Sequence, residues 1–132
     1  MRKKILFLAG MMACSSLAGA QEISKTWVAD KGNGTYQNPV LHADYSDPDI
    51  CAAGDDFYMT ASSFNCIPGI PILHSNDLVN WSLVNYALPV QEPESFFDKA
   101  QHGKGVWAPA IRFHNGEFYI YWGASGLWNL YD

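Results

Sequence analysis

The sequence predicts an all-β fold made of repeated small antiparallel sheets, arranged as in a propeller. Short strand-like runs bounded by Gly, Pro, Asn or Asp follow one another along most of the chain. One strand–turn–strand unit also recurs, because the pattern from Pro48 to Tyr58 returns from Pro109 to Tyr119 at an offset of sixty-one residues. A chance similarity of two hairpins is the alternative. After residue 20 no segment shows a helical period, so we expect strands throughout.

Length and composition narrow the class of protein. The 132 residues allow one domain at most, and 14% of them are aromatic while only 16% are charged. This balance excludes a disordered chain, a coiled coil and a basic nucleic-acid arm. The net charge of −5 gives no reason to expect a nucleic-acid partner.

The first twenty residues are typical of a signal peptide. Residues 2–4 are basic, residues 5–13 are apolar, and residues 18–20 have the small side chains that precede signal-peptidase cleavage. The apolar run is too short to be a transmembrane segment. We therefore expect export to the periplasm or the extracellular space, with the mature chain beginning near Gln21. Lipid modification of Cys14 and a buried N-terminal helix are the competing interpretations.

The elements expected after the signal peptide follow in order. Residues 21–35 are a polar lead-in without periodicity. Four strands are predicted, over residues 49–53, 57–62, 71–74 and 81–88. The turn after His74 contains Asp77, which we expect to accept backbone hydrogen bonds. Residues 89–105 are predicted to be a loop, and a second hairpin follows over residues 106–114 and 117–123, with Asn115 and Gly116 in its turn.

Cysteines and histidines give no strong signal for a metal. Export would permit a disulfide between Cys51 and Cys66, although a buried free thiol is the commoner outcome for a cysteine in an apolar strand. His42, His102 and His114 lack the spacing of a metal-ligand set. No metal site and no cofactor are predicted.

The internal repeat singles out one carboxylate. Asp47 precedes the repeated proline in the first copy, whereas Ala108 occupies that place in the second. A functional group added to one copy of a repeated scaffold would produce such a difference. The alternative is that Asp47 only begins a turn, because Asp-Pro is a common turn pair.

Several short motifs together resemble the opening of glycoside hydrolase family 43. The motifs, in chain order, are Asn38-Pro39-Val40-Leu41, Asp47-Pro48-Asp49-Ile50, Ala53-Gly54-Asp55-Asp56-Phe57-Tyr58, Ser63-Phe64, Pro68-Gly69-Ile70, His74-Ser75-Asn76-Asp77-Leu78-Val79-Asn80-Trp81 and Gly105-Val106-Trp107-Ala108-Pro109. The resemblance covers residues 36–123 and implies a five-bladed β-propeller, of which this chain would supply about the first one and a half blades. Residues 36–123 are therefore interpreted as a partial glycosidase propeller.

The resemblance also implies roles for three residues. Asp47 matches the family's general base, which activates water for attack on the anomeric carbon. Phe64 and Trp107 match aromatic residues that line the sugar-binding pocket. Asp44 and Asp49 are rival carboxylates that fall off the base position. The implied activity is inverting hydrolysis of α-L-arabinofuranosyl or β-D-xylosyl linkages in plant polysaccharides, without a cofactor.

An inverting glycosidase also needs a carboxylic acid, separated from the base by roughly 6.5–9.5 Å. In this family the acid and a carboxylate that tunes its pKa come from later blades. We therefore expect residues 1–132 alone to be inactive and prone to aggregation. A non-catalytic carbohydrate-binding propeller fragment and a pseudogene product remain the alternative interpretations.

Residues 124–132 depart from the resemblance. After Tyr121-Trp122-Gly123 the family tends to continue with Asp-Pro-Asp-Tyr-Gly-Ile-Tyr-Met, whereas this chain has a different tail. A single inserted base converts one DNA string into the other. The hypothesis is therefore a frameshift at this point, and an unrelated natural tail is the alternative.

Overall fold

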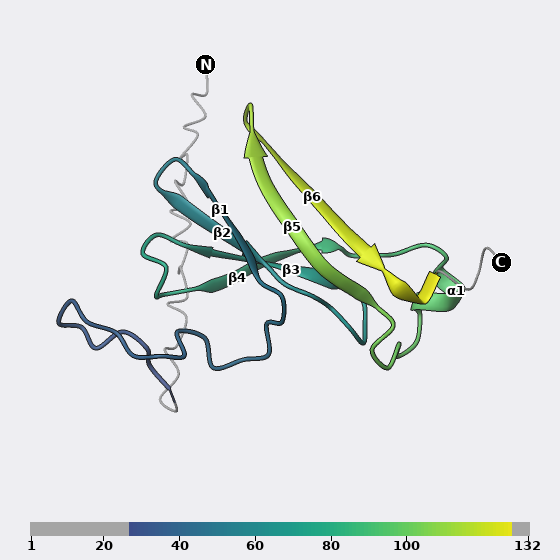
Figure 1. Ribbon diagram of the computed structural model, residues 1–132, viewed down its shortest axis with the longest axis horizontal. Coiled ribbons are helices and arrows are strands. Elements are labelled where there is room, and N and C mark those ends of the chain that lie inside the picture. The colour runs from purple at the N-terminus through teal and green to yellow at the C-terminus, as the bar shows by residue number, and fades with distance from the viewer. Residues whose placement is uncertain (1–26, 128–132) are drawn as a thin grey trace, which may run out of the picture.

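The computed structural model describes residues 27–127, which form two antiparallel sheets (Figure 1). The first sheet has its four strands in the order of the chain: β1 (Asp49–Ala53), β2 (Asp56–Thr60), β3 (Gly69–Ser75) and β4 (Ser82–Leu88). A four-stranded meander of this kind is one blade of a propeller. The predicted signal peptide with Cys14, and residues 128–132 of the tail, lie outside the described residues.

The second sheet is a hairpin of β5 (Val106–His114) and β6 (Glu117–Ala124). Its turn has left-handed backbone at both Asn115 (φ 50°) and Gly116 (φ 83°). These angles define the type I′ turn that the Asn-Gly pair favours, because that turn matches the twist of the flanking strands. The hairpin predicted from the sequence is therefore confirmed.

The predicted loop over residues 89–105 needs one correction. It contains α1 (Glu94–Phe97), a single helical turn whose Phe97 side chain is buried. A four-residue helix is too short to produce a helical period, so the sequence pattern could not reveal it. A 3₁₀ turn, η1 (Ser125–Leu127), follows β6.

The hydrophobic core lies between the first sheet and β5. Met59, Ile70 and Leu73 come from the first sheet, and Val106 and Ile111 come from β5; all five are buried. Figure 1 shows β5 crossing the first sheet, and its contacts there are with β1, β2 and β3. The two sheets are thus packed together rather than merely adjacent in the chain.

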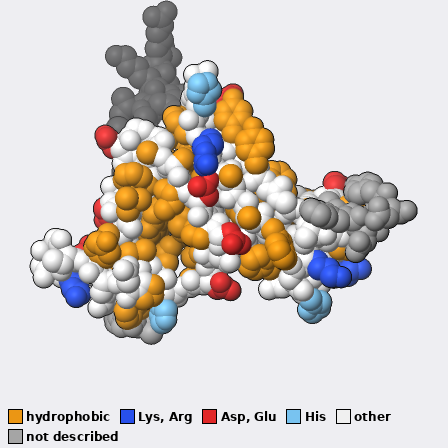
Figure 2. Space-filling view, in the orientation of Figure 1, with side chains coloured by type: hydrophobic (Ala, Val, Ile, Leu, Met, Phe, Trp, Pro, Cys, Tyr) orange, Lys and Arg blue, Asp and Glu red, His pale blue; other side chains and the backbone are white. Residues whose placement is uncertain are grey.

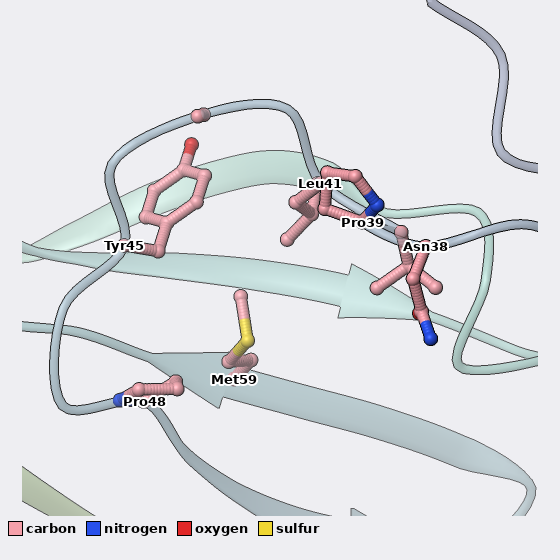
Figure 3. A pocket seen from close by; sticks show the side chains of 8 residues that line it. Asn38, Pro39, Leu41, Tyr45, Pro48 and Met59 are labelled. Atoms are coloured by element: carbon pink, nitrogen blue, oxygen red, sulfur yellow. The ribbon is translucent and has the colours of Figure 1, made fainter.

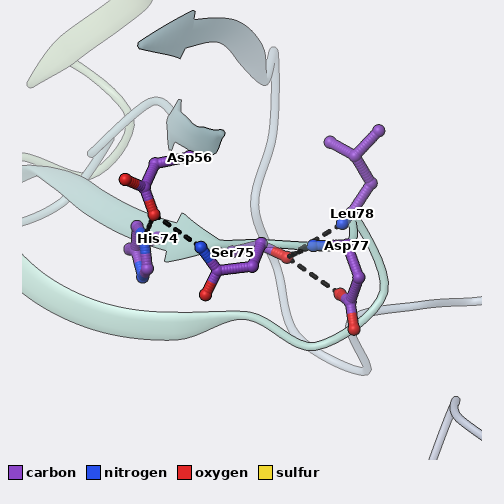
Figure 4. A network of polar contacts seen from close by, with 6 residues as sticks. Asp56, His74, Ser75, Asp77 and Leu78 are labelled. Atoms are coloured by element: carbon purple, nitrogen blue, oxygen red, sulfur yellow. Dashed lines mark hydrogen bonds and ion pairs between the residues drawn. The ribbon is translucent and has the colours of Figure 1, made fainter. Parts of the chain in front are cut away.

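The turn between β3 and β4 is held by side-chain hydrogen bonds (Figure 4). Asp77 accepts the backbone N–H groups of Val79 (2.8 Å) and Asn80 (2.7 Å), which confirms the role expected for it. The hydrogen bonds from the Asn80 backbone and side chain lower the pKa of Asp77 to about 2. At the same end of the sheet, Nε2 of His74 on β3 lies 2.7 Å from Oδ1 of Asp56 on β2 and joins these two strands.

Asp49 joins the two sheets. Its Oδ2 accepts the backbone N–H of Ile111 (2.8 Å) and lies 2.5 Å from Nη1 of Arg112. Burial alone would raise the pKa of Asp49, but these donors outweigh it and the pKa is lowered from 3.8. The carboxylate is therefore engaged in holding β1 against β5.

Replacing Asp49 with alanine should lower the free energy of unfolding by about 1–2 kcal/mol at neutral pH, because a charged acceptor for a backbone N–H is lost. The folded-state pKa lies below the unfolded one. This stabilisation is therefore present above the ordinary value of 3.8 and is lost as the pH falls through the folded-state pKa. Urea unfolding at several pH values measures it, with Asp55→Ala in the exposed β1–β2 turn as the control. A difference between wild type and Asp49→Ala that persists unchanged in acid would contradict this account.

The β5–β6 hairpin carries large apolar side chains on its exposed surface. Five of them, each between 39% and 66% exposed, lie within residues 113–122: Phe113, Phe118, Tyr119, Tyr121 and Trp122. Figure 2 shows extended hydrophobic areas on the face in view. A two-stranded sheet with such a surface favours association with other sheet structure.

Candidate active site

Asp47 lies immediately before β1 with left-handed backbone (φ 50°). Its repeat partner Ala108 also has left-handed backbone (φ 41°), at an irregularity in the β5–β6 register between Trp107 and Ala110. Non-glycine residues seldom adopt this conformation, although aspartate tolerates it better than most. The two copies of the repeat therefore share a special backbone geometry, and only the first places a carboxylate on it.

Ser62 connects these two positions. Its hydroxyl donates to Oδ2 of Asp47 (2.8 Å), and its Oγ accepts the backbone N–H of Ala108 (2.9 Å). The backbone N–H of Ser62 donates to the carbonyl of Ser46 (3.0 Å), which fixes Ser62 beside the segment that carries Asp47. A short hydrogen-bonded path thus runs from the second sheet to the carboxylate.

Phe64 and Trp107 form an edge-to-face pair with ring centroids 5.6 Å apart and an interplanar angle of 82°. The Trp107 indole N–H donates to the carbonyl of Gly103 (2.7 Å), which fixes the ring, and 46% of the residue is exposed. Backbone hydrogen bonds join Ser63 to Val106 in both directions, at 3.0 and 2.9 Å. The segment that carries Phe64 is therefore attached to the start of β5.

The structure thus links the segments that carry the three predicted site residues. Ser62 bonds Asp47 and lies two residues before Phe64, and its second partner, Ala108, directly follows Trp107. A cleft of about 250 Å³ opens beside Ser62 and Phe64 and has both polar and apolar walls. A carboxylate linked to the half-buried Phe64 and the exposed Trp107 is suited to hold a sugar ring and to activate water.

A larger cavity, of about 550 Å³, shares Tyr45 with this cleft (Figure 3). It lies between residues 38–45 and the first sheet, and its walls include Leu41, Tyr45 and Met59. The lining is mostly apolar and contains no carboxylate. Its chemistry does not match the site predicted from the sequence, whereas the smaller cleft adjoins that site.

The rival carboxylates occupy different surroundings. Asp49 is held by Ile111 and Arg112, as described above. Asp44 lies exposed at the rim of the 250 Å³ cleft, on the segment that leads to Asp47. The carboxylate bonded by Ser62 is that of Asp47.

Cys51 and Cys66 are free thiols in the structure, and burial raises the pKa of the Cys51 thiol. Within residues 27–127 no group of three or more His, Cys, Asp and Glu side chains could hold a metal ion. Over the same residues, no helix is long and apolar enough to cross a membrane.

Sequence reasoning missed Ser62. One signal was available, because the sixty-one-residue offset pairs Ser62 with Gly123. This is the same contrast between a polar and a small residue that singled out Asp47 against Ala108. Strand patterns could not show that the hydroxyl bridges the two sheets.

The family model for glycosyl hydrolases family 43 matches residues 36–129. The chain belongs to glycoside hydrolase family 43. The match includes Asp47, Phe64 and Trp107, and it continues into the tail that begins at residue 124.

The curated relatives of this chain are named as arabinofuranosidases and xylosidases. The non-reducing end α-L-arabinofuranosidase BoGH43B of Bacteroides ovatus is 41% identical over 86 residues, covering 65% of this chain and 16% of that protein. A β-xylosidase of Formosa agariphila is 36% identical over 130 residues, covering 89% of this chain and 22% of that protein. The family 43 chain described here therefore spans less than a quarter of the length of these relatives.

Solved structures agree with the family and with the fold. The family 43 protein BlXynB of Bacillus licheniformis is 42% identical and has a TM-score of 0.57, covering 64% of this chain and 16% of that one. The xylan β-1,4-xylosidase of Bacillus halodurans is 34% identical with a TM-score of 0.51, over 64% of this chain and 16% of that one. The matched family 43 proteins are five-bladed β-propellers, and this all-β chain corresponds to part of one.

Proposed function

We propose that this family 43 chain contributes the general base of an exported glycosidase that hydrolyses α-L-arabinofuranosyl or β-D-xylosyl linkages in plant polysaccharides with inversion. Asp47 is the base, and Phe64 and Trp107 form an apolar wall for the pentose ring. The charged and apolar pattern of residues 1–20 supports export. The names of the relatives, which include an arabinofuranosidase and β-xylosidases, support the substrate class.

One observation carries the proposal: Ser62 links the carboxylate of Asp47 to the segments that carry the ring pair of Phe64 and Trp107. Asp47 is exposed, so water can reach its carboxylate. A carboxylate base removes a proton from the attacking water as the new bond to the anomeric carbon forms. The aromatic rings beside it provide the apolar surface that a sugar ring packs against.

The general acid is expected from later blades, outside this sequence. Loss of general-acid assistance typically slows a reaction about 10²–10⁴-fold. We therefore propose that the chain acts only when further blades complete the propeller and bring the acid opposite Asp47.

The test starts at the gene. Resequencing from the Tyr121 codon onward tests the frameshift hypothesis for residues 124–132, and the protein of the confirmed reading frame is then expressed. Hydrolysis of 4-nitrophenyl α-L-arabinofuranoside and 4-nitrophenyl β-D-xyloside is measured, and NMR determines the anomer released first. We expect hydrolysis of at least one substrate with inversion, and much slower hydrolysis by residues 1–132 alone.

Two outcomes would contradict the proposal. A first-formed sugar of retained configuration would remove the role of general base from Asp47. Absence of hydrolysis by a protein whose confirmed reading frame encodes the later blades would overturn the glycosidase activity. Binding of xylo- or arabino-oligosaccharides by that inactive protein would then favour the non-catalytic carbohydrate-binding alternative.

A further inference from the structure

We infer that Ser62 is a positioning residue that orients the carboxylate of Asp47 and makes this orientation depend on the second sheet. The inference rests on the proposed function of Asp47 as the general base. The Ser62 hydroxyl contacts the carboxylate of Asp47, so Ser62 would act through Asp47.

The direction of the hydrogen-bonded path is fixed by chemistry. The backbone N–H of Ala108 can only donate, so Oγ of Ser62 is the acceptor at 2.9 Å. A serine hydroxyl has one hydrogen to donate, and a carboxylate can only accept. The hydroxyl of Ser62 therefore donates to Oδ2 of Asp47 at 2.8 Å.

Ser62 is itself held from two directions. Its backbone N–H donates to the carbonyl of Ser46 at 3.0 Å, next to Asp47. The adjacent Ser63 exchanges backbone hydrogen bonds with Val106 at the start of β5. Ser62 is thus fixed between the two sheets, and its hydroxyl has a defined place.

The contact leaves one carboxylate oxygen of Asp47 for catalysis. Within residues 27–127 the hydrogen bonds to this carboxylate go to Oδ2, from Ser62 at 2.8 Å and from Ser46 at a weaker 3.4 Å. Oδ1 is then the oxygen left to accept a proton from the attacking water. Because Asp47 is exposed, packing alone does not fix its rotamer, and the Ser62 hydroxyl supplies that restraint.

The inference also explains why Ala108 has left-handed backbone. At φ 41° its N–H donates to Ser62, within the irregular part of the β5–β6 register. Strained backbone of this kind persists where the surrounding structure gains from it. Here the second sheet supplies the donor that fixes Ser62.

The test compares Ser62→Ala, Ser62→Thr and Ser63→Ala in the protein of the confirmed reading frame. Ser63→Ala is the matched control, since it removes a neighbouring hydroxyl that accepts the Ile70 N–H (2.8 Å) and does not bond Asp47. For Ser62→Ala we expect kcat to fall about 10-fold or more, as for loss of a hydrogen bond to a charged group, with KM within about twofold. Ser62→Thr retains a hydroxyl and should recover most of kcat, while Ser63→Ala should leave kcat unchanged.

Asp47→Ala is measured alongside, so that failure of the inference and failure of the proposed function can be told apart. If Asp47→Ala is inactive while Ser62→Ala keeps its kcat, or while Ser62→Ala and Ser63→Ala lose it equally, the positioning role is wrong and the base survives. If Asp47→Ala remains active, or the wild type does not hydrolyse the substrates, the proposed function fails and the positioning role with it. Amide exchange at Ala108, faster in Ser62→Ala but not in Ser63→Ala, checks the hydrogen bond itself.

Discussion

Replacing Asp47 with alanine is expected to lower kcat about 10²–10⁴-fold in the protein of the confirmed reading frame, because water loses its general base. Sodium azide should restore part of the rate with the nitrophenyl substrates. Azide is a small anion that needs no base and can enter the space left by the carboxylate. It forms the bond to the anomeric carbon as the nitrophenolate leaves, so the product is a glycosyl azide of inverted configuration.

The control for this prediction is Asp44→Ala. Asp44 is also an exposed carboxylate on the segment that leads into β1, but the bond from Ser62 goes to Asp47. We expect Asp44→Ala to keep most of the activity and to gain nothing from azide. A large loss of activity in Asp44→Ala, together with an active Asp47→Ala, would show that Asp47 is not the base.

Gly105→Ala is expected to destabilise the fold by about 1–3 kcal/mol, the usual cost of forcing an extra carbon into a packed site. A Cβ at this position would lie 2.8 Å from the carbonyl oxygen of Phe64, and still closer to that of Ser63. The Gly105 N–H already donates to the Phe64 carbonyl (2.9 Å), so the two segments cannot separate without losing that bond. Denaturant unfolding followed by tryptophan fluorescence measures the effect.

The same substitution should disturb sugar binding. Moving the Phe64 backbone away from β5 separates the Phe64 ring from Trp107, so we expect KM to rise more than kcat falls. Gly123→Ala is the matched control, since its Cβ would lie 3.8 Å from the Trp107 carbonyl oxygen, an ordinary contact. Equal destabilisation by the two substitutions would show that the close approach at Gly105 is not the cause.

Much of the fold could be predicted from the sequence because its signals are local. Strand-like runs between turn-forming residues predicted all six strands to within a few residues, and the Asn115-Gly116 pair predicted the second hairpin. The one-turn helix α1 was not predicted, because four residues are too few to show a helical period. The exposed apolar surface of β5 and β6 agrees with the aggregation expected of an incomplete propeller, although the sequence did not say which residues would be exposed.

The candidate site was only partly predictable. The repeat at sixty-one residues pointed to Asp47 and the family motifs to Asp47, Phe64 and Trp107, and the structure links the segments that carry them through Ser62. The sequence could not exclude Asp49 on physical grounds, because its two partners, Ile111 and Arg112, lie more than sixty residues away. Nor did it identify Ser62.

By itself, the sequence determined the strands, the turns, the repeat and the family, since each depends on residues close together in the chain or on their order. Only the tertiary structure decided which carboxylate is tied to the aromatic pair and which one joins the two sheets. That choice depends on how β5 packs across the first sheet, which places Ala108 against Ser62 and Arg112 against Asp49. Hydrogen bonds reach only about 3 Å, so contacts between distant segments exist only once the core between the sheets has formed.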